Sequence, residues 1–214
     1  MDRGGLRSLS MEVFDQLAEL YQNEHSHNPF QNALVSQLAD LLPPASTVLD
    51  LGCGTGVPTA AILTASDHQV VGVDISQGML ALARAQVPEA EFVHADFAAL
   101  PDDFGADRGG FAAVTAFFSL LMLSRADIET TIAKVARWLQ PDGHLAIGMV
   151  NFDLDSAPVE FLGVPVKVSG YLEPDLAALL ERHGFHVESI KTVEFTPAGT
   201  PPESQIFALA KLKS

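Results

Sequence analysis

Three glycines lie within five positions of the segment VLDLGCGTGVP, residues 48–58, directly after a run of strand-forming residues. Glycine accepts backbone angles that other residues avoid, and it lets a ligand approach the main chain. The dinucleotide fingerprint G-x-G-x-x-G would need its third glycine at Val57 when counted from Gly52, or at Thr59 when counted from Gly54. Neither position holds a glycine. The spacing G-x-G-x-G therefore argues against a dinucleotide as the ligand.

Three aspartates stand where three consecutive strands are expected to end. Asp50 precedes the first glycine by two positions, Asp74 ends the second strand-like run, and Asp96 follows the third. A carboxylate beside the glycines would repel a pyrophosphate but would suit an ammonium group. In adenosine-binding sheets an acid at the position of Asp74 accepts hydrogen bonds from ribose hydroxyls, and Asp96 could accept one from an adenine amino group. Together the acids describe a ligand with an ammonium, a ribose diol and an adenine, and no phosphate.

Alternating strand-like and helix-like segments position these acids. The expected strands cover 46–51, 69–74, 90–96, 111–118, 144–150, 185–195 and 204–213. The expected helices cover 12–22, 30–42, 57–66, 76–86, 125–139 and 174–182. Ser76 and Ser124 are expected N-caps, PDG at 141–143 predicts a turn, and 151–172 predicts loops and short strands. This alternation is typical of a parallel sheet covered by helices on both faces, with ligands beyond the carboxyl ends of the strands.

The composition narrows the class of partner. The chain has 214 residues, 27 Asp and Glu against 12 Lys and Arg, and a formal net charge of -15. Because nucleic-acid binding needs a basic footprint, we expect neither nucleic acid nor an anionic membrane as the main partner. The single cysteine, Cys53, excludes an intramolecular disulfide and favours a cytoplasmic location, and no signal-peptide pattern is visible. The apolar run 111–123 is too short to span a bilayer.

A family resemblance follows from four motifs that occur in order between about 47 and 150. They are VLDLGCGTG, VVGVDIS, HADF and WLQPDGHLAIG. This series resembles the class I S-adenosylmethionine-dependent methyltransferases. FSLLML at 118–123 and the segment 161–169 are similar to small bacterial members that act on small molecules. The resemblance implies a doubly wound, Rossmann-like, seven-stranded and mostly parallel sheet with an antiparallel C-terminal hairpin, S-adenosylmethionine as cofactor, and methyl transfer to N or O of a small molecule.

The same resemblance implies roles for individual residues. At the methionine end of the cofactor it places Asp50, Gly52, Cys53 and Gly54. At the ribose and adenine it places Asp74, Ile75, Met79, Asp96 and Phe97. Phe117 is also expected at the cofactor, Tyr21 is expected to cap it, and Phe118, Ser119 and Asn151 are expected to face the substrate.

Catalytic residues do not follow from the sequence, because transfer from an activated sulfonium depends largely on positioning. Weak candidates are His25, His27, Asn151 and Tyr171. The histidine pair HSH does not make a metal site without further ligands, so no metal is expected. Two other functions stay open: a protein that binds S-adenosylmethionine or S-adenosylhomocysteine without catalysis, as a sensor or partner subunit, and a nicotinamide-linked oxidoreductase.

The chain is expected to form one methyltransferase domain, 1–214. Within it, 1–44 would be an N-terminal helical lid, 45–150 the cofactor-binding core, and 151–214 a substrate-side loop and C-terminal hairpin. The acids Asp153, Asp155 and Glu160 are expected in a solvated loop; if they rim the site, they would favour a cationic substrate. The oligomeric state does not follow from the sequence.

Overall fold

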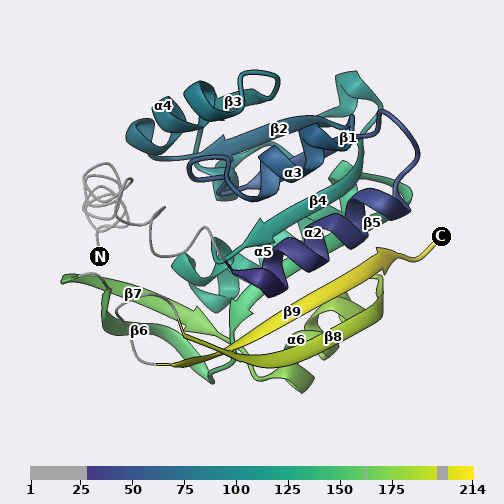
Figure 1. Cartoon of the computed structure of the whole chain (residues 1–214). Helices are drawn as coiled ribbons and strands as arrows, with labels where there is room; N and C mark the ends of the chain where they lie inside the picture. Colours follow the sequence, from purple (N-terminus) through teal and green to yellow (C-terminus); the bar gives the residue numbers. More distant parts are fainter. Residues whose placement is uncertain (1–27, 162, 197–201) are drawn as a thin grey trace.

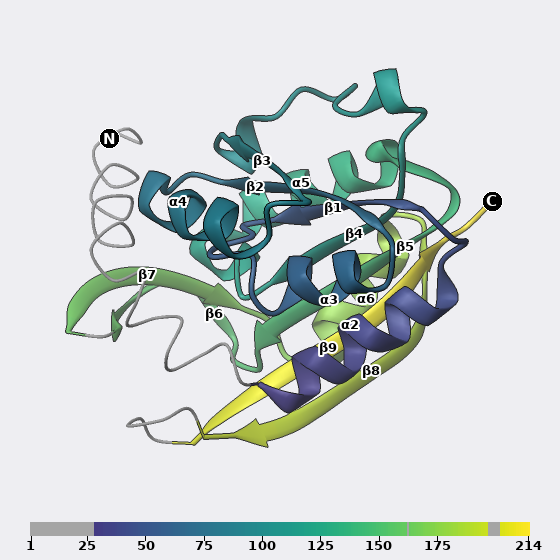
Figure 2. The same ribbon diagram turned by 45° about the horizontal axis from the view of Figure 1, so that its top comes forward.

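The computed structural model describes residues 28–161, 163–196 and 202–214. The expected helix 12–22 and the candidates Tyr21, His25 and His27 lie outside these ranges. A single seven-stranded sheet forms the centre of the molecule, with helices on both of its faces (Figures 1 and 2). None of the helices in the described ranges is long and apolar enough to cross a membrane.

The central sheet has the strand order β3-β2-β1-β4-β5-β9-β8. Its strands are β1 (Thr47–Leu51), β2 (Gln69–Asp74), β3 (Glu91–His94), β4 (Phe111–Phe117), β5 (Leu139–Val150), β8 (Phe185–Phe195) and β9 (Glu203–Leu212). The first five pair in parallel, whereas β9 pairs antiparallel with both β5 and β8. The predicted doubly wound sheet with an antiparallel C-terminal hairpin is therefore confirmed.

Two hydrophobic cores attach the helices to the sheet. The helices are α2 (Pro29–Leu41), α3 (Thr59–Ala65), α4 (Gln77–Gln86), α5 (Arg125–Trp138) and α6 (Glu173–Arg182). On one face α2, α3 and α4 bury Leu38, Leu63 and Leu80 against the strands. On the other face α5 and α6 bury Ile132 and Leu179. Apolar residues on both faces of each central strand explain why these strands are continuous apolar runs.

The helix starts agree with the expected N-caps. The Ser76 hydroxyl accepts a hydrogen bond from the Met79 backbone N–H at 3.1 Å, and α4 begins one residue later. At α5, Ser124 accepts from the Asp127 N–H at 3.2 Å and donates to the Asp127 carboxylate at 2.8 Å. Each cap satisfies a backbone donor that has no partner inside the helix. Because β2 ends directly before α4, this cap fixes where the residues after β2 lie.

Two regions differ from the expectation. The stretch 151–172 contains a separate antiparallel hairpin of β6 (Leu154–Phe161) and β7 (Val164–Gly170), which is longer and more regular than the predicted loops. Apolar and polar residues alternate along these strands, and their burial alternates in the same way. The prolines and glycines of the stretch hide this pattern in the sequence. The predicted turn at 141–143 lies inside β5, where the register shifts, because Phe111 and Ala113 of β4 pair with Leu139 and His144.

Candidate cofactor and acceptor site

The glycine loop after β1 leaves no room for a side chain at its first position. Gly52 has a φ of +69°, and its N–H donates to the Val73 carbonyl of β2 at 2.7 Å. A Cβ at Gly52 would lie 2.3 Å from the Ser119 Cβ. The Ser119 hydroxyl in turn donates to the Leu51 carbonyl at 2.6 Å. The loop is therefore clamped between the end of β2 and the segment that follows β4, with its backbone exposed to a ligand.

Asp50, in β1, is almost fully buried beneath this loop. One of its oxygens accepts a hydrogen bond from the Thr115 hydroxyl at 2.7 Å. The other, Oδ2, is buried and has no hydrogen-bond partner among the described residues. Burial raises the pKa of Asp50 to about 7, with a further increase from the charge of Asp74, while the Thr115 hydroxyl lowers it. An unpartnered buried oxygen of this kind fits a ligand that brings an ammonium group.

Asp74, at the end of β2, connects the glycine loop to α4. Its Oδ2 accepts from the Gly54 N–H at 2.9 Å, and its Oδ1 accepts from the Ser76 N–H at 2.8 Å. The side chain therefore supports the loop, and it also lines the cavity described below.

Asp96 caps a short helix while bordering the same space. Its Oδ1 accepts from the Ala98 N–H at 3.0 Å at the start of η1 (Phe97–Ala99). Asp96 and Phe97 also line the cavity. The same side chain therefore supports η1 and borders the cavity.

A cavity of about 480 Å³ unites most of the predicted site residues, which is a typical volume for a small-molecule pocket. It begins at the ends of β1, β2 and β3 and continues to β9 and the β6–β7 hairpin. The predicted residues that line it are Gly52, Gly54, Asp74, Ile75, Met79, Asp96, Phe97, Phe117, Phe118 and Ser119. Asp50, Cys53, Asn151 and Tyr171 do not line it.

Comparison with known proteins identifies the family. Residues 48–143 match the family described as methyltransferase domain. An O-methyltransferase of Aspergillus nomiae is 30% identical, with 70% of this chain and 66% of that protein covered. The chain belongs to the class I S-adenosylmethionine-dependent methyltransferases. S-adenosylmethionine is the cofactor of this family, and the strand-end acids Asp74 and Asp96 that line the cavity fit its ribose hydroxyls and its adenine amino group.

Two further relatives show the range of the family. A dTDP-3-amino-3,6-dideoxy-alpha-D-glucopyranose N,N-dimethyltransferase of Streptomyces fradiae is 32% identical, with 62% of this chain and 52% of that protein covered. The chain thus spans about half to two thirds of the length of these two curated relatives. The 1,6-didemethyltoxoflavin-N1-methyltransferase of Burkholderia thailandensis, solved with its substrate and S-adenosylhomocysteine, shares the fold with a TM-score of 0.70 at 21% identity, covering 98% of this chain and 88% of that one.

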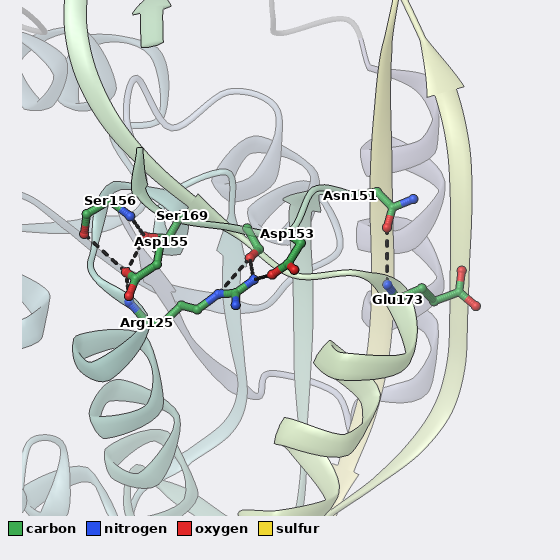
Figure 3. Close-up of polar contacts among 8 residues, drawn as sticks. Arg125, Asn151, Asp153, Asp155, Ser156, Ser169 and Glu173 are labelled. Atoms are coloured by element: carbon green, nitrogen blue, oxygen red, sulfur yellow. Dashed lines mark hydrogen bonds and ion pairs between the residues drawn. The ribbon is translucent and has the colours of Figure 1, made fainter. Parts of the chain in front are cut away.

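Two predicted residues outside the cavity have structural contacts in this methyltransferase. The Asn151 side-chain oxygen accepts from the Glu173 N–H at 3.2 Å (Figure 3), and its amide donates to the Ser204 hydroxyl at 3.3 Å. These bonds connect the end of β5 to α6 and β9. The Tyr171 ring lies under the guanidinium of Arg125, 4.4 Å from ring centroid to Cζ, and burial raises its pKa. Asn151 and Tyr171 therefore hold elements together and do not line the cavity.

Arg125, the first residue of α5, anchors the β6–β7 hairpin (Figure 3). Its guanidinium donates to the Gly170 carbonyl at 2.5 and 3.1 Å and pairs with Asp153 at 2.7 Å. Its backbone N–H donates to the Asp155 carboxylate at 3.1 Å, and the Ser156 N–H donates to the Ser169 hydroxyl. Asp153 and Asp155 are exposed to solvent, as expected, but both also bind Arg125, and Asp155 lies in strand β6 and not in a loop.

Cys53 is buried in the hydrophobic core and does not line the cavity. A Cβ at Gly72 of β2 would lie 2.8 Å from the Cys53 sulfur, so the side chain fills the space beside that glycine. Burial raises the pKa of the thiol, and the charges of Asp50 and Asp74 raise it further. A thiol with a raised pKa is a poor nucleophile. The structure therefore agrees with a packing role for Cys53.

Sequence reasoning missed more than half of the residues that line the cavity. Four polar residues among those missed are Asn28, Gln31, Glu203 and Gln205. The apolar residues among them are Leu121, Met122, Leu123, Val150, Phe152, Leu154, Val159, Phe161, Val166, Val168 and Phe195. One signal was available, since Gln205 stands at the start of the apolar run IFALA in β9 and is almost fully buried. The others have no local pattern that marks them.

Proposed function

We propose that the protein transfers a methyl group from S-adenosylmethionine to a nitrogen or oxygen atom of a small molecule. The observation that carries this proposal is one continuous cavity that joins the glycine loop and strand-end acids to an apolar compartment. A cofactor at the first part and an acceptor in the second would meet inside a single enclosed space. Curated relatives include both an O-methyltransferase and an N,N-dimethyltransferase, so both acceptor atoms stay in the proposal.

In this proposal the strand ends hold the cofactor. The backbone of Gly52 and Gly54, with the buried Asp50 behind it, receives the methionine end. Asp74, which lines the cavity at the end of β2, receives the ribose hydroxyls. Asp96, beside Phe97, receives the adenine. The chemistry that S-adenosylmethionine supplies is a methyl group already activated by its sulfonium.

The residues of this chain would align the acceptor with the methyl group and exclude water from the reacting atoms. Phe117 ends β4, and Phe118 and Ser119 follow it at the boundary between the two parts of the cavity. Phe118 has a φ of +54°, and its N–H donates to the Gly148 carbonyl of β5 at 2.8 Å, which fixes this left-handed residue in place. A rigid boundary can hold nucleophile and methyl carbon in line, which accounts for much of the rate enhancement that positioning gives. The apolar wall excludes water from the reacting atoms.

Calorimetry and methyl transfer test this function against its alternatives. We expect S-adenosylmethionine and S-adenosylhomocysteine to bind and NAD to fail to bind, which would exclude a nicotinamide-linked oxidoreductase. Transfer of labelled methyl to a fraction of small-molecule extract would exclude a non-catalytic binder. Asp74→Ala should abolish cofactor binding, while the matched variant Asp107→Ala, in η2 (Ala106–Arg108) away from the cavity, should bind normally. Unchanged affinity in Asp74→Ala would overturn the assignment of Asp74. A cytoplasmic location stays a prediction from the single cysteine.

A further inference from the structure

The acceptor half of the cavity, defined here as Asn28 together with the lining from β4 onward to the hairpin and β9, has an apolar wall. The β6–β7 hairpin contributes side chains from both of its strands, among them Leu154, Val159, Val166 and Val168. Residues after β4 and the end of β5 complete the wall. An apolar enclosure of this kind favours an acceptor with a hydrocarbon or aromatic body.

All ionisable residues among the described lining of the whole cavity are acids. They are Asp74 and Asp96 at the cofactor half, and Glu160 and Glu203 at the acceptor half. Glu160 comes from the hairpin and is exposed, whereas Glu203 comes from β9 and is half-buried, so the two acids line the acceptor half from different elements. An anionic acceptor would lose water in an apolar space and meet charges of its own sign, and both effects oppose its binding.

A chain of buried amides holds Glu203 at the cavity. The Asn28 amide donates to the Gln205 side-chain oxygen at 2.7 Å, and the Gln205 amide donates to the Glu203 carboxylate at 2.5 Å. Asn28 and Gln205 are each only 2% exposed, and both line the cavity with Glu203. Asn28 is itself fixed, because its oxygen caps α2 by accepting from the Phe30 N–H at 3.0 Å. Glu203 is therefore a carboxylate held in a set position by two buried side chains.

We infer that the methyl acceptor is an apolar molecule that carries a positively charged amine and no anionic group, and that Glu203 recognises the amine. The inference that this ligand is the methyl acceptor rests on the proposed function. The recognition of the amine depends only on the cavity. A carboxylate fixed at an apolar wall forms a strong, charge-assisted hydrogen bond with an ammonium group. The positive group serves recognition, because a protonated amine has no lone pair with which to attack a methyl carbon.

Three probes with one apolar body and different charges test the inference. Naphthylethylamine, naphthylethanol and naphthylacetate are titrated by calorimetry into the full-length protein saturated with S-adenosylhomocysteine. We expect the amine to bind about tenfold more tightly than the carboxylate, with the alcohol between them, from the charge-assisted bond and the like-charge repulsion. Equal affinities, tighter binding of the carboxylate, or failure of all three probes to bind would overturn the inference.

A matched pair of variants assigns the preference to Glu203. Glu203→Gln should weaken binding of the amine about tenfold and leave that of the alcohol within about twofold. Glu194→Gln makes the same change at an exposed glutamate of the adjacent strand β8, outside the cavity, and should change neither. Equal effects of the two variants would overturn the role of Glu203, because a change in net charge alone would then explain them.

Two separate readouts distinguish this inference from the proposed function. Probe binding reports recognition, whereas labelled methyl transfer reports catalysis. Preference for the amine without methyl transfer to any extract component would overturn the proposed function and leave the recognition intact. Methyl transfer to extract components together with a preference for the carboxylate probe would support the proposed function and overturn the inferred recognition of an amine. If S-adenosylhomocysteine itself fails to bind, the cofactor assignment fails, and the probes are titrated into the protein alone.

Discussion

The two halves of the cavity are built in different ways. The cofactor half comes from one stretch of chain, 52–97, and it uses backbone groups, acids at strand ends and a glycine that admits no side chain. The acceptor half combines segments from 28 to 205 and is lined by replaceable apolar side chains. The difference shows that a common ligand is bound by a local motif, whereas a particular ligand is bound by residues that only the fold brings together.

Gly52→Ala should have the largest effect, and it tests whether the cofactor half is rigid. The alanine would have to adopt the left-handed φ of Gly52, and its Cβ would lie 2.3 Å from the Ser119 Cβ. Because both effects destabilise the folded state, we expect a loss of about 3 kcal/mol or more in the free energy of unfolding. Gly109→Ala is the matched control. Its φ is +74° and nothing lies within 4 Å of the new Cβ, so about 1 kcal/mol is expected. Urea denaturation measures both, and equal losses would contradict the contact.

The pH dependence of stability should report Asp50. The ordinary pKa of 3.8 is raised to about 7 in the folded protein, so between these values the folded state keeps a proton that the unfolded chain has released. The free energy of unfolding should therefore fall as the pH rises from about 4 to about 7, by about 4 kcal/mol at most. Asp50→Asn should remove this slope. Parallel curves for the two proteins in urea denaturation at a series of pH values would refute the shift.

Arg125→Met should separate the two halves. Loss of the bonds to Gly170 and Asp153 should lower the free energy of unfolding by about 2 kcal/mol and speed hydrogen exchange in the β6–β7 hairpin. Affinity for S-adenosylhomocysteine should stay within about twofold, since Arg125 does not line the cavity. Arg137→Met, at the other end of α5 with an exposed pair to Asp102, should cost about 0.5 kcal/mol or less. A large loss of cofactor affinity in Arg125→Met would show that the halves are coupled.

Val159→Ala should have the smallest effect on the free energy of unfolding. The wall of the acceptor half faces a ligand cavity, so its side chains are packed less tightly than those of the hydrophobic core. This half-buried side chain of β6 should cost about 1 kcal/mol or less in the free energy of unfolding. Val48→Ala, in β1 and fully buried, should cost about 2 kcal/mol. Thermal denaturation compares the pair. Equal costs would mean that the hairpin wall is packed as tightly as the centre of the sheet.

The sequence predicted what depends on local chemistry. The strands, the caps at Ser76 and Ser124, and the acids at the strand ends follow from patterns of a few residues, and the order of the motifs indicated the family. The β6–β7 hairpin was missed because Pro158, Pro165 and Gly163 break the alternation that marks strands. Asn151 was misplaced for another reason: its position after β5 indicates a site, but its contacts with Ser204 and Glu173 depend on tertiary packing.

The position of β9 determines the order in which the site can be completed during synthesis. This strand inserts between β5 and β8, and it leaves the ribosome after every other strand of the sheet. A nascent chain can therefore assemble the motif that holds S-adenosylmethionine well before Glu203 and Gln205 exist to complete the acceptor half. Until then the edge of β5 has no partner on that side, and such an open edge invites wrong pairing with other chains. The last strand to be made thus both closes the sheet and adds the residues that we propose select the acceptor.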